Sequence, residues 1–329
     1  MNISPRSYRY LVPALLPLAA LYLLWRARKQ PSYLKNWGER FAWSDFPRPR
    51  EARPVIWIHA VSVGETNATR PLVQEILKRW PQCDILLTHM TPTGREAGQR
   101  IVQLAPDRIR QCFLPYDAVY AVRKFLRQTQ PILGLLMETE VWPTVLEEAH
   151  SLGIPMVLVN GRLSEKSFKQ AMRVPELMKK AMSRFVAVCA QADNDAKRFL
   201  KLGTVEPVLT GSLKFDIQAP KAALTKAAEW KKALLHPVVL FASTRDGEEA
   251  LIVEALKKSI RPDVTYLLVP RHPQRFEEVE SLLKDSAITY QKRSELKNPA
   301  DIKSSTRVIL GDSMGEMFFY CALADVTLM

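Results

Sequence analysis

From residue 54 onward, short apolar runs alternate with amphipathic segments, and this alternation limits the possible folds more than any other feature. The first apolar run covers residues 55–61, and the segment after it places its apolar residues on one helical face. Further runs follow at 84–89, 111–117, 132–138, 155–160 and 184–190, and amphipathic segments lie near 118–128, 142–152, 165–182 and 193–202. Strands that alternate with helices of this length form right-handed βαβ units. The pattern therefore predicts a doubly wound α/β fold with parallel sheets.

A break in this rhythm divides the chain into two domains. Residues 217–230 interrupt the alternation, which restarts at residue 237 with further apolar runs at 237–244, 265–270, 307–312 and 324–329. We therefore predict an N-terminal segment, a first domain and a second domain, at residues 1–30, 31–216 and 217–329. In doubly wound sheets, ligands bind beyond the carboxyl ends of the strands, so candidate site residues are sought there.

The N-terminal segment has the composition of a membrane anchor. Residues 10–25 carry no charged side chain, although the run is shorter than the roughly 20 residues of a spanning helix. Residues 26–53 then contain eight Lys/Arg and three Asp/Glu. A signal peptide would have a small-residue cleavage site here, whereas positive charge favours retention on the cytoplasmic side. We predict an anchor or interfacial helix; the alternative is a buried first helix of the domain.

The charge balance predicts an anionic partner. The formal net charge is +13, which suits membrane phospholipid, a phosphorylated ligand or nucleic acid. Nucleic acid ranks behind the other two because the aromatic and basic strand motifs of common RNA-binding folds are absent. The four cysteines and five histidines show no metal-ligand spacing, and the Asp-Asn-Asp at 193–195 is explained as the start of a helix. We predict neither a metal site nor nucleic-acid binding.

Glu65 is the first candidate site residue. It follows the strand expected at 55–61 through Gly64, and the helix after it is expected to begin near Asn67. A carboxylate at a helix start interacts favourably with the helix dipole, by about 0.3–1 kcal/mol, which explains the residue without a function. A general base that accepts a proton from an attacking hydroxyl is the alternative, and local sequence leaves both open.

Three further candidate residues lie at the ends of strands in the first half of the chain. Glu138 and Glu140 lie at the end of a very apolar strand, where a carboxylate needs a partner or a task. Lys214 lies in a Gly-Ser turn and could neutralise a phosphate or a developing anion. A structural ion pair with an arginine would also explain the glutamates, and an exposed lysine at a hinge would explain Lys214.

In the second half, two strand ends carry residues that suit a nucleotide phosphate. Pro270 and Arg271 directly follow the strand expected at 265–270, and arginine suits phosphate through its bidentate fork. The turn GDSMGEM contains Met314, Gly315 and Glu316 and leads into a helix, whose first N–H groups are free to bind an anion. Each signal is weak alone, but both fall at strand ends of the same predicted domain.

Nine motifs taken together resemble a known family. They are KNWGERF, HAVSVGET, THMTPTG, FLPYD, METEVWP, NGRLS, TGSLKFD, VPRHPQRF and GDSMGEM, and they occur in this order over nearly the whole chain. In this respect the chain resembles the 3-deoxy-D-manno-octulosonic acid (Kdo) transferases of lipopolysaccharide core biosynthesis. Any one motif is unspecific, whereas nine in register are highly specific.

The resemblance implies a fold, a reaction and roles for residues. The fold is a glycosyltransferase B-type pair of Rossmann-like domains, and the reaction is inverting transfer of Kdo from CMP-Kdo to lipid A precursor (lipid IVA), without metal or cofactor. The enzyme is expected on the cytoplasmic face of the inner membrane, held by its N-terminal anchor in contact with phospholipid. By motif, the base falls on Glu65 and the charge-stabilising pair on Glu138 and Lys214. CMP binding falls on residues that are spread over two motifs, Pro270, Arg271, Met314, Gly315 and Glu316.

The chain also departs from the family. Family members continue beyond the position of Met329, through an Asn-Pro-x-Glu segment that helps to bind CMP. From the sequence we therefore expect an incomplete donor domain. The alternative to an active transferase is a truncated remnant that binds the membrane without turnover.

Overall fold

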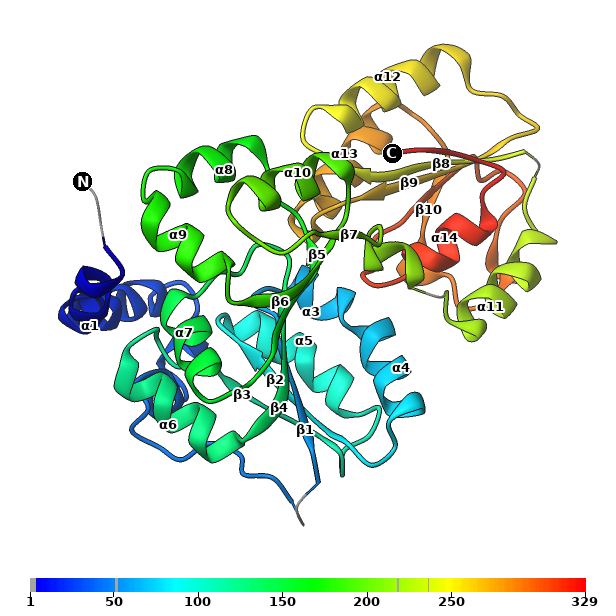
Figure 1. Ribbon diagram of the computed structural model, residues 1–329. Helices are drawn as coiled ribbons and strands as arrows, with labels where there is room; N and C mark the ends of the chain where they lie inside the picture. Colours follow the sequence, from blue (N-terminus) through cyan, green and yellow to red (C-terminus); the bar gives the residue numbers. More distant parts are fainter. Residues whose placement is uncertain (1–3, 51–52, 218, 236) are drawn as a thin grey trace. The chain divides into compact units, whose positions relative to one another are not determined.

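The computed structural model describes residues 4–50, 53–217, 219–235 and 237–329. The chain divides into two compact units, Met1–Ile217 and Gln218–Met329. Each unit is built on a sheet whose paired strands are all parallel, with helices on both faces (Figure 1). The predicted doubly wound α/β fold is confirmed.

The first unit contains a seven-stranded sheet in the order β3-β2-β1-β4-β5-β6-β7. Its strands are β1 (Val55–His59), β2 (Asp84–His89), β3 (Ile109–Phe113), β4 (Pro131–Met137), β5 (Met156–Gly161), β6 (Phe185–Ala190) and β7 (Val208–Leu209). The apolar runs predicted β1 to β6 to within a few residues, whereas the two-residue strand β7 was not among them. The order changes direction between β1 and β4, which makes this the topological switch point of the sheet.

The helices of the first unit follow the amphipathic segments. They are α1 (Pro5–Ala27), α2 (Trp37–Arg40), α3 (Val63–Ala68), α4 (Arg70–Arg79), α5 (Pro92–Val102), α6 (Val119–Thr129), α7 (Pro143–Ser151), α8 (Glu165–Ala171), α9 (Pro175–Met182) and α10 (Asp193–Lys201), with 3₁₀ turns η1 (Pro31–Leu34) and η2 (Leu213–Asp216). One amphipathic segment, at 165–182, forms two helices because Pro175 disfavours helical geometry in the residue before it. Among the described residues, α1 is the helix long and apolar enough to cross a membrane, by length and composition.

Side chains of alternate strand residues build the core on both faces of the first sheet. Trp57 points into the cluster that includes α6 and α7, whereas Ile56 and Ile58 point into the cluster that includes α4 and α5. All five residues of β1 are buried, as expected for a central parallel strand. This central position fixes the end of β1, from which residues 60–62 lead into α3, the helix that carries Glu65.

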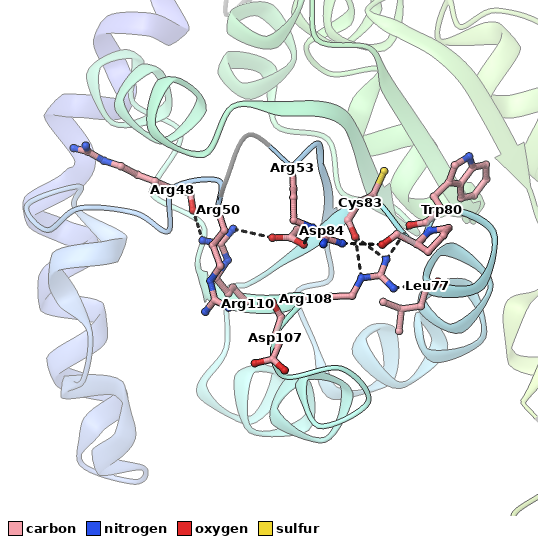
Figure 2. Close-up of polar contacts among 11 residues, drawn as sticks. Arg48, Arg50, Arg53, Leu77, Trp80, Cys83, Asp84, Asp107, Arg108 and Arg110 are labelled. Atoms are coloured by element: carbon pink, nitrogen blue, oxygen red, sulfur yellow. Dashed lines mark hydrogen bonds and ion pairs between the residues drawn. The ribbon is translucent and has the colours of Figure 1, made fainter.

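The amino-terminal edge of the same sheet is stabilised by charge. Asp84 begins β2 and is 1% exposed, and its carboxylate lies 2.9 Å from Arg53 and 3.7 Å from Arg110. Figure 2 shows this group together with Arg108, which donates hydrogen bonds to main-chain oxygens of Leu77, Trp80 and Cys83. Paired arginines make it possible to bury a carboxylate here. This arginine cluster therefore has a structural explanation, at the edge opposite to the one where ligands bind.

The second unit contains a five-stranded sheet in the order β10-β11-β9-β8-β12. Its strands are β8 (Val238–Thr244), β9 (Thr265–Pro270), β10 (Tyr290–Lys292), β11 (Val308–Leu310) and β12 (Val326–Leu328), and its helices are α11 (Lys221–Lys231), α12 (Glu248–Ser259), α13 (Phe276–Asp285) and α14 (Met317–Leu323), with 3₁₀ turns η3 (Pro273–Arg275), η4 (Arg293–Glu295) and η5 (Pro299–Asp301). Helices α11 and α14 cover one face, and α12 and α13 cover the other. The short strand β10 has no place in the predicted set, because Tyr-Gln-Lys is not an apolar run.

Candidate active site

The first unit brings two of the predicted residues to its topological switch point. Glu65 follows β1 and Glu138 follows β4. These strands are parallel neighbours, and His59 near the end of β1 pairs with Leu136 near the end of β4. Their carboxyl ends therefore meet at the same edge of the sheet, on either side of the change in strand order. Doubly wound folds bind ligands in the crevice at this point.

Glu65 lies in the first turn of α3, because this helix begins at Val63, four residues before the predicted start near Asn67. Ser62 caps the helix by accepting a hydrogen bond from the Glu65 N–H at 3.3 Å. The Glu65 carboxylate in turn accepts hydrogen bonds of 2.8 Å from the Val61 N–H and the Ser62 hydroxyl. Burial raises the pKa of Glu65 above its ordinary value; the negative charge of Glu138 adds to the shift, and the hydrogen bonds oppose it. The residue thus stabilises a helix start and is also a carboxylate with increased proton affinity.

Glu138 is held by an ion pair and an unusual backbone conformation. Its φ of +56° lies in the left-handed region, which a non-glycine residue adopts at an energetic cost. Its N–H donates to the Val159 oxygen at 3.0 Å, and its carboxylate lies 3.1 Å from the Lys214 ammonium. The partner of Glu138 is therefore Lys214, rather than the arginine that a purely structural ion pair was expected to supply.

Lys214 reaches the switch point because the chain turns back after the edge strand β7. Asn160, at the end of β5, accepts a hydrogen bond of 3.1 Å from the Leu213 N–H through its side-chain oxygen. Asn160 is buried and has a φ of +55°, a conformation that asparagine tolerates better than most residues. Sequence reasoning assigned no role to Asn160; an asparagine ending an otherwise apolar strand was the available signal.

Glu140 is a third carboxylate in this group. The indole N–H of Trp142 donates a hydrogen bond of 2.9 Å to it, and the Trp142 ring packs edge-on against His59 with centroids 5.9 Å apart. Burial raises the pKa of Glu140 to about 7, and the negative charges of Glu65 and Glu138 add to the shift. Glu140 therefore gains and loses its proton near neutral pH.

Replacing Glu140 with glutamine should change how stability depends on pH. The pKa of Glu140 in the folded chain, about 7, lies above its ordinary value of 4.5, so its favourable contribution is complete below 4.5 and is lost as pH rises through 7. Glutamine cannot ionise. We expect the free energy of unfolding of Glu140→Gln, relative to that of the unchanged chain, to increase as pH rises from 5 to 8. Denaturant titration at each pH measures this difference. A difference that stays constant over this range would contradict the assignment.

In the second unit, Arg271 is placed at the carboxyl end of β9. Pro270 ends the strand and is buried, whereas Arg271 is exposed and its N–H donates to the Thr244 oxygen at 2.9 Å. Across the described ranges, no hydrogen bond or ion pair of the Arg271 guanidinium is found. An exposed guanidinium at a strand end is suited to binding an anion.

Met314, Gly315 and Glu316 form the turn between β11 and α14. Gly315 has a φ of +81°, which favours glycine, and Met314 is 64% exposed. Glu316 accepts from the Ser313 hydroxyl at 2.5 Å, and its carboxylate lies 3.0 Å from Lys226 and 2.8 Å from Arg293. Burial opposes ionisation of Glu316, but these three partners together hold its pKa below the ordinary value.

The described residues contain no group of three or more His, Cys, Asp or Glu side chains placed to hold a metal ion. The Asp-Asn-Asp segment serves the start of α10. Asp193 forms an ion pair of 2.5 Å with Lys197, and Asp195 accepts a hydrogen bond of 2.9 Å from the Leu163 N–H. Both aspartates lie in the first turn of α10, as a helix start predicts, although the N-cap position is Ala192 rather than Asp193.

Comparison with known proteins decides the family. The sequence profile of the 3-deoxy-D-manno-octulosonic-acid transferase (kdotransferase) family matches residues 35–217. The chain is 40% identical over 327 residues to the 3-deoxy-D-manno-octulosonic acid transferase of Bordetella pertussis, covering 96% of this chain and 75% of that protein. The chain belongs to the Kdo transferase family. The Haemophilus influenzae Kdo transferase is 32% identical, covering 94% of this chain and 72% of the relative.

Solved structures with a similar fold come from more distant proteins. UDP-GlcNAc 2-epimerase from Neisseria meningitidis is 13% identical, with a TM-score of 0.55, and the match covers 83% of this chain and 76% of that one. Anabaena HepE, solved with UDP, has 13% identity and a TM-score of 0.52, and the match covers 83% and 73% of the two chains. These likenesses concern the fold alone. The chain has a glycosyltransferase B-type fold, and it is a glycosyltransferase of lipopolysaccharide biosynthesis.

Proposed function

We propose that the chain transfers Kdo from CMP-Kdo to a hydroxyl of a lipid A precursor, with inversion at the anomeric carbon and without a metal ion. The observation that carries this proposal is the placement of Glu65 beside the Glu138–Lys214 ion pair at the switch point of the first sheet. Membership of the Kdo transferase family supplies the sugar. The donor, the acceptor and the roles of the residues are inferences from the family motifs and from this geometry.

In this mechanism Glu65 acts as the general base. Its carboxylate takes the proton of the acceptor hydroxyl as the hydroxyl oxygen bonds to the anomeric carbon of Kdo. The bond from that carbon to the phosphate oxygen breaks on the opposite face, and CMP leaves with the bonding electron pair. A raised pKa suits this task, because a more basic carboxylate draws the proton more strongly. Ser62 and Val61 fix the carboxylate by hydrogen bonds.

The Glu138–Lys214 pair supplies fixed charge near the reaction. The ammonium and the carboxylate are 3.1 Å apart and partly shielded from water, so their fields act more strongly than in bulk solvent. Lys214 favours negative charge that develops on the leaving phosphate, and Glu138 holds Lys214 in place. Asn160 fixes the backbone of Leu213, the residue before Lys214, and this restricts where the Lys214 ammonium can lie.

CMP is assigned to the second unit, with Pro270 and Arg271 on one strand end and Met314, Gly315 and Glu316 on another. The exposed guanidinium of Arg271 suits the phosphate, and the open backbone at Gly315 allows close approach of a ligand, since a Cβ there would meet nothing within 4 Å. Glu316 positions the turn through Ser313 and Arg293.

Arg271→Ala should weaken binding of CMP by about 10-fold or more, because a charge-assisted hydrogen bond to phosphate contributes roughly 1.5–3 kcal/mol. Calorimetric titration of CMP into the purified protein measures the change. Arg261→Ala is the control, since Arg261 is exposed in the same unit and pairs with Asp263. Equal CMP affinity of Arg271→Ala and the unchanged protein would remove Arg271 from the donor site.

The acceptor is an amphipathic anionic lipid, which accounts for both the apolar helix α1 and the net positive charge. We place the protein on the cytoplasmic face of the inner membrane, attached through α1. The direct test of the proposed function is incubation of the purified chain with CMP-Kdo and lipid IVA, followed by mass spectrometry of the lipid. A mass gain of one or more Kdo units supports the proposal. If the protein binds the membrane but the lipid stays unmodified, the non-catalytic alternative is favoured.

A further inference from the structure

One stripe of α1 packs against the first unit along the whole length of the helix. The residues in this stripe recur every three or four positions and meet the domain in every turn; they are Tyr8, Val12, Leu16, Ala20, Leu23 and Ala27. Residues at this spacing share one helical face. Helix α1 is therefore attached to the domain along a continuous face, and is not a free tether that precedes it.

Polar contacts hold the amino-terminal end of this helix. The Tyr8 hydroxyl donates a hydrogen bond of 2.8 Å to Asp117, which is 3% exposed and also accepts from the N–H groups of Thr144 and Val145 at the start of α7. Arg9 lies 3.5 Å from Glu148 on the same helix α7. These partners belong to the folded domain, so the amino-terminal end of α1 lies beside its core elements.

Aromatic packing holds the carboxyl-terminal end of α1. Leu23 is 2% exposed and packs with Tyr33 and Phe41 in a small separate cluster, and Arg26 donates to the Tyr33 hydroxyl at 3.0 Å. Both ends of α1 are thus fixed to the same unit. A helix of 23 residues is about 34 Å long at 1.5 Å per residue, comparable to the 30 Å hydrocarbon core of a bilayer.

The opposite face of α1 is apolar and open to solvent. Its large side chains are 39–81% exposed and do not belong to the clusters of buried residues among the described residues; they are Tyr10, Leu11, Leu15, Leu18, Leu21, Tyr22, Leu24 and Trp25. Soluble proteins rarely expose an apolar surface of this extent unless it binds something. Exposed basic residues flank this face: Arg6 lies in the first turn of α1, and Arg28 and Lys29 follow its last residue. Apolar side chains with basic flanks are the pattern that binds an anionic lipid surface.

A spanning orientation conflicts with these contacts. If α1 crossed the bilayer, the buried Asp117, the Glu148 pair and the helices α7 and α9 beside it would have to enter the hydrocarbon with it. Exposed charged residues on those helices, among them Lys179 and Lys180 of α9, make that position costly. Detaching α1 would instead break the whole packed stripe.

We propose that α1 lies in the plane of an anionic phospholipid membrane, with its packed stripe on the protein and its opposite face in the lipid, and does not cross the bilayer. The inference rests on the membrane attachment in the proposed function and specifies its geometry. It also places the first unit against the membrane surface along the length of α1.

Depth measurements distinguish the two orientations. A fluorophore is attached to cysteine at Leu11, Leu18 or Leu24 in a Cys321→Ser background, and its quenching by spin-labelled lipids is measured on vesicles of phosphatidylglycerol and phosphatidylcholine. An in-plane helix places all three labels at a similar shallow depth, roughly 5–10 Å below the headgroups. A spanning helix places Leu18 near the bilayer centre and the other two near opposite surfaces, and that depth profile would overturn the proposal.

Accessibility of the helix start gives an independent answer. Ser7, which is exposed, is replaced by cysteine in the same Cys321→Ser background, and the protein is added outside sealed vesicles that hold a membrane-impermeant maleimide in their lumen. We expect Ser7→Cys to react no more than a Ser281→Cys control on α13, because an in-plane helix keeps both residues outside the lumen. Reaction of Ser7→Cys alone would show that the helix crosses the bilayer. Failure of the protein to float with the vesicles would instead refute the membrane attachment itself.

Discussion

Glu65→Gln should lower the rate of Kdo transfer by about 10²–10⁴-fold, the contribution that a positioned general base makes. Glutamine has the same size but cannot accept the proton of the attacking hydroxyl. Its amide oxygen can still accept one of the two hydrogen bonds that Val61 and Ser62 now donate. The measurement is the initial rate of lipid modification at saturating CMP-Kdo, with CMP affinity determined in parallel.

The helix-start role of Glu65 requires a control for folding. Glu75→Gln removes an exposed glutamate on α4 that pairs with Arg79, and its rate should equal that of the unchanged protein. The free energy of unfolding of Glu65→Gln reports the loss of the capping contacts separately. If its rate stayed near that of the unchanged protein, Glu65 would be a structural residue alone. A rate loss with unchanged CMP affinity supports the base.

The fold could be predicted because its signal lies in short segments. Apolar runs such as 84–89 predict a buried strand without reference to the rest of the chain, and parallel βαβ units follow from the spacing. Strand β10, which the sequence did not predict, is polar and forms because it pairs with β11. No local sequence pattern encodes that contact. Likewise, the long segment at 165–182 is divided by the single residue Pro175.

The sequence predicted where the candidate site residues lie along the chain, but not which side chains they contact. Glu65 and Glu138 could be placed at strand ends, and parallel pairing of β1 with β4 explains why they meet. The Glu138–Lys214 pair joins residues 76 positions apart, and it depends on how the chain returns from β7 past Asn160. The raised pKa of Glu140 likewise depends on burial that only the packed loop creates.

Lys214→Ala should reduce Kdo transfer by about 10²–10³-fold, similar to the loss of one group that stabilises charge in a transition state. The ammonium lies 3.1 Å from Glu138, so its removal also leaves that carboxylate without its cation. We expect kcat to fall more than the affinity for CMP, because the proposed charge develops only as CMP departs. Lys169→Ala, which removes an exposed lysine of α8 paired with Glu165, is the control and should retain full activity.

A double-mutant cycle decides whether Glu138 and Lys214 act as a unit. If the pair works together, Glu138→Gln combined with Lys214→Ala should be little slower than the slower single variant, since the second change removes a group that has already lost its partner. Rate losses that multiply would show that the two residues act independently despite the ion pair. Lys214→Arg provides the remaining comparison: it keeps the charge but changes its position, so partial recovery of kcat would separate electrostatic stabilisation from simple anchoring of Glu138. Full activity of Lys214→Ala would exclude the residue from the reaction and leave it a structural contact of the chain's return from β7.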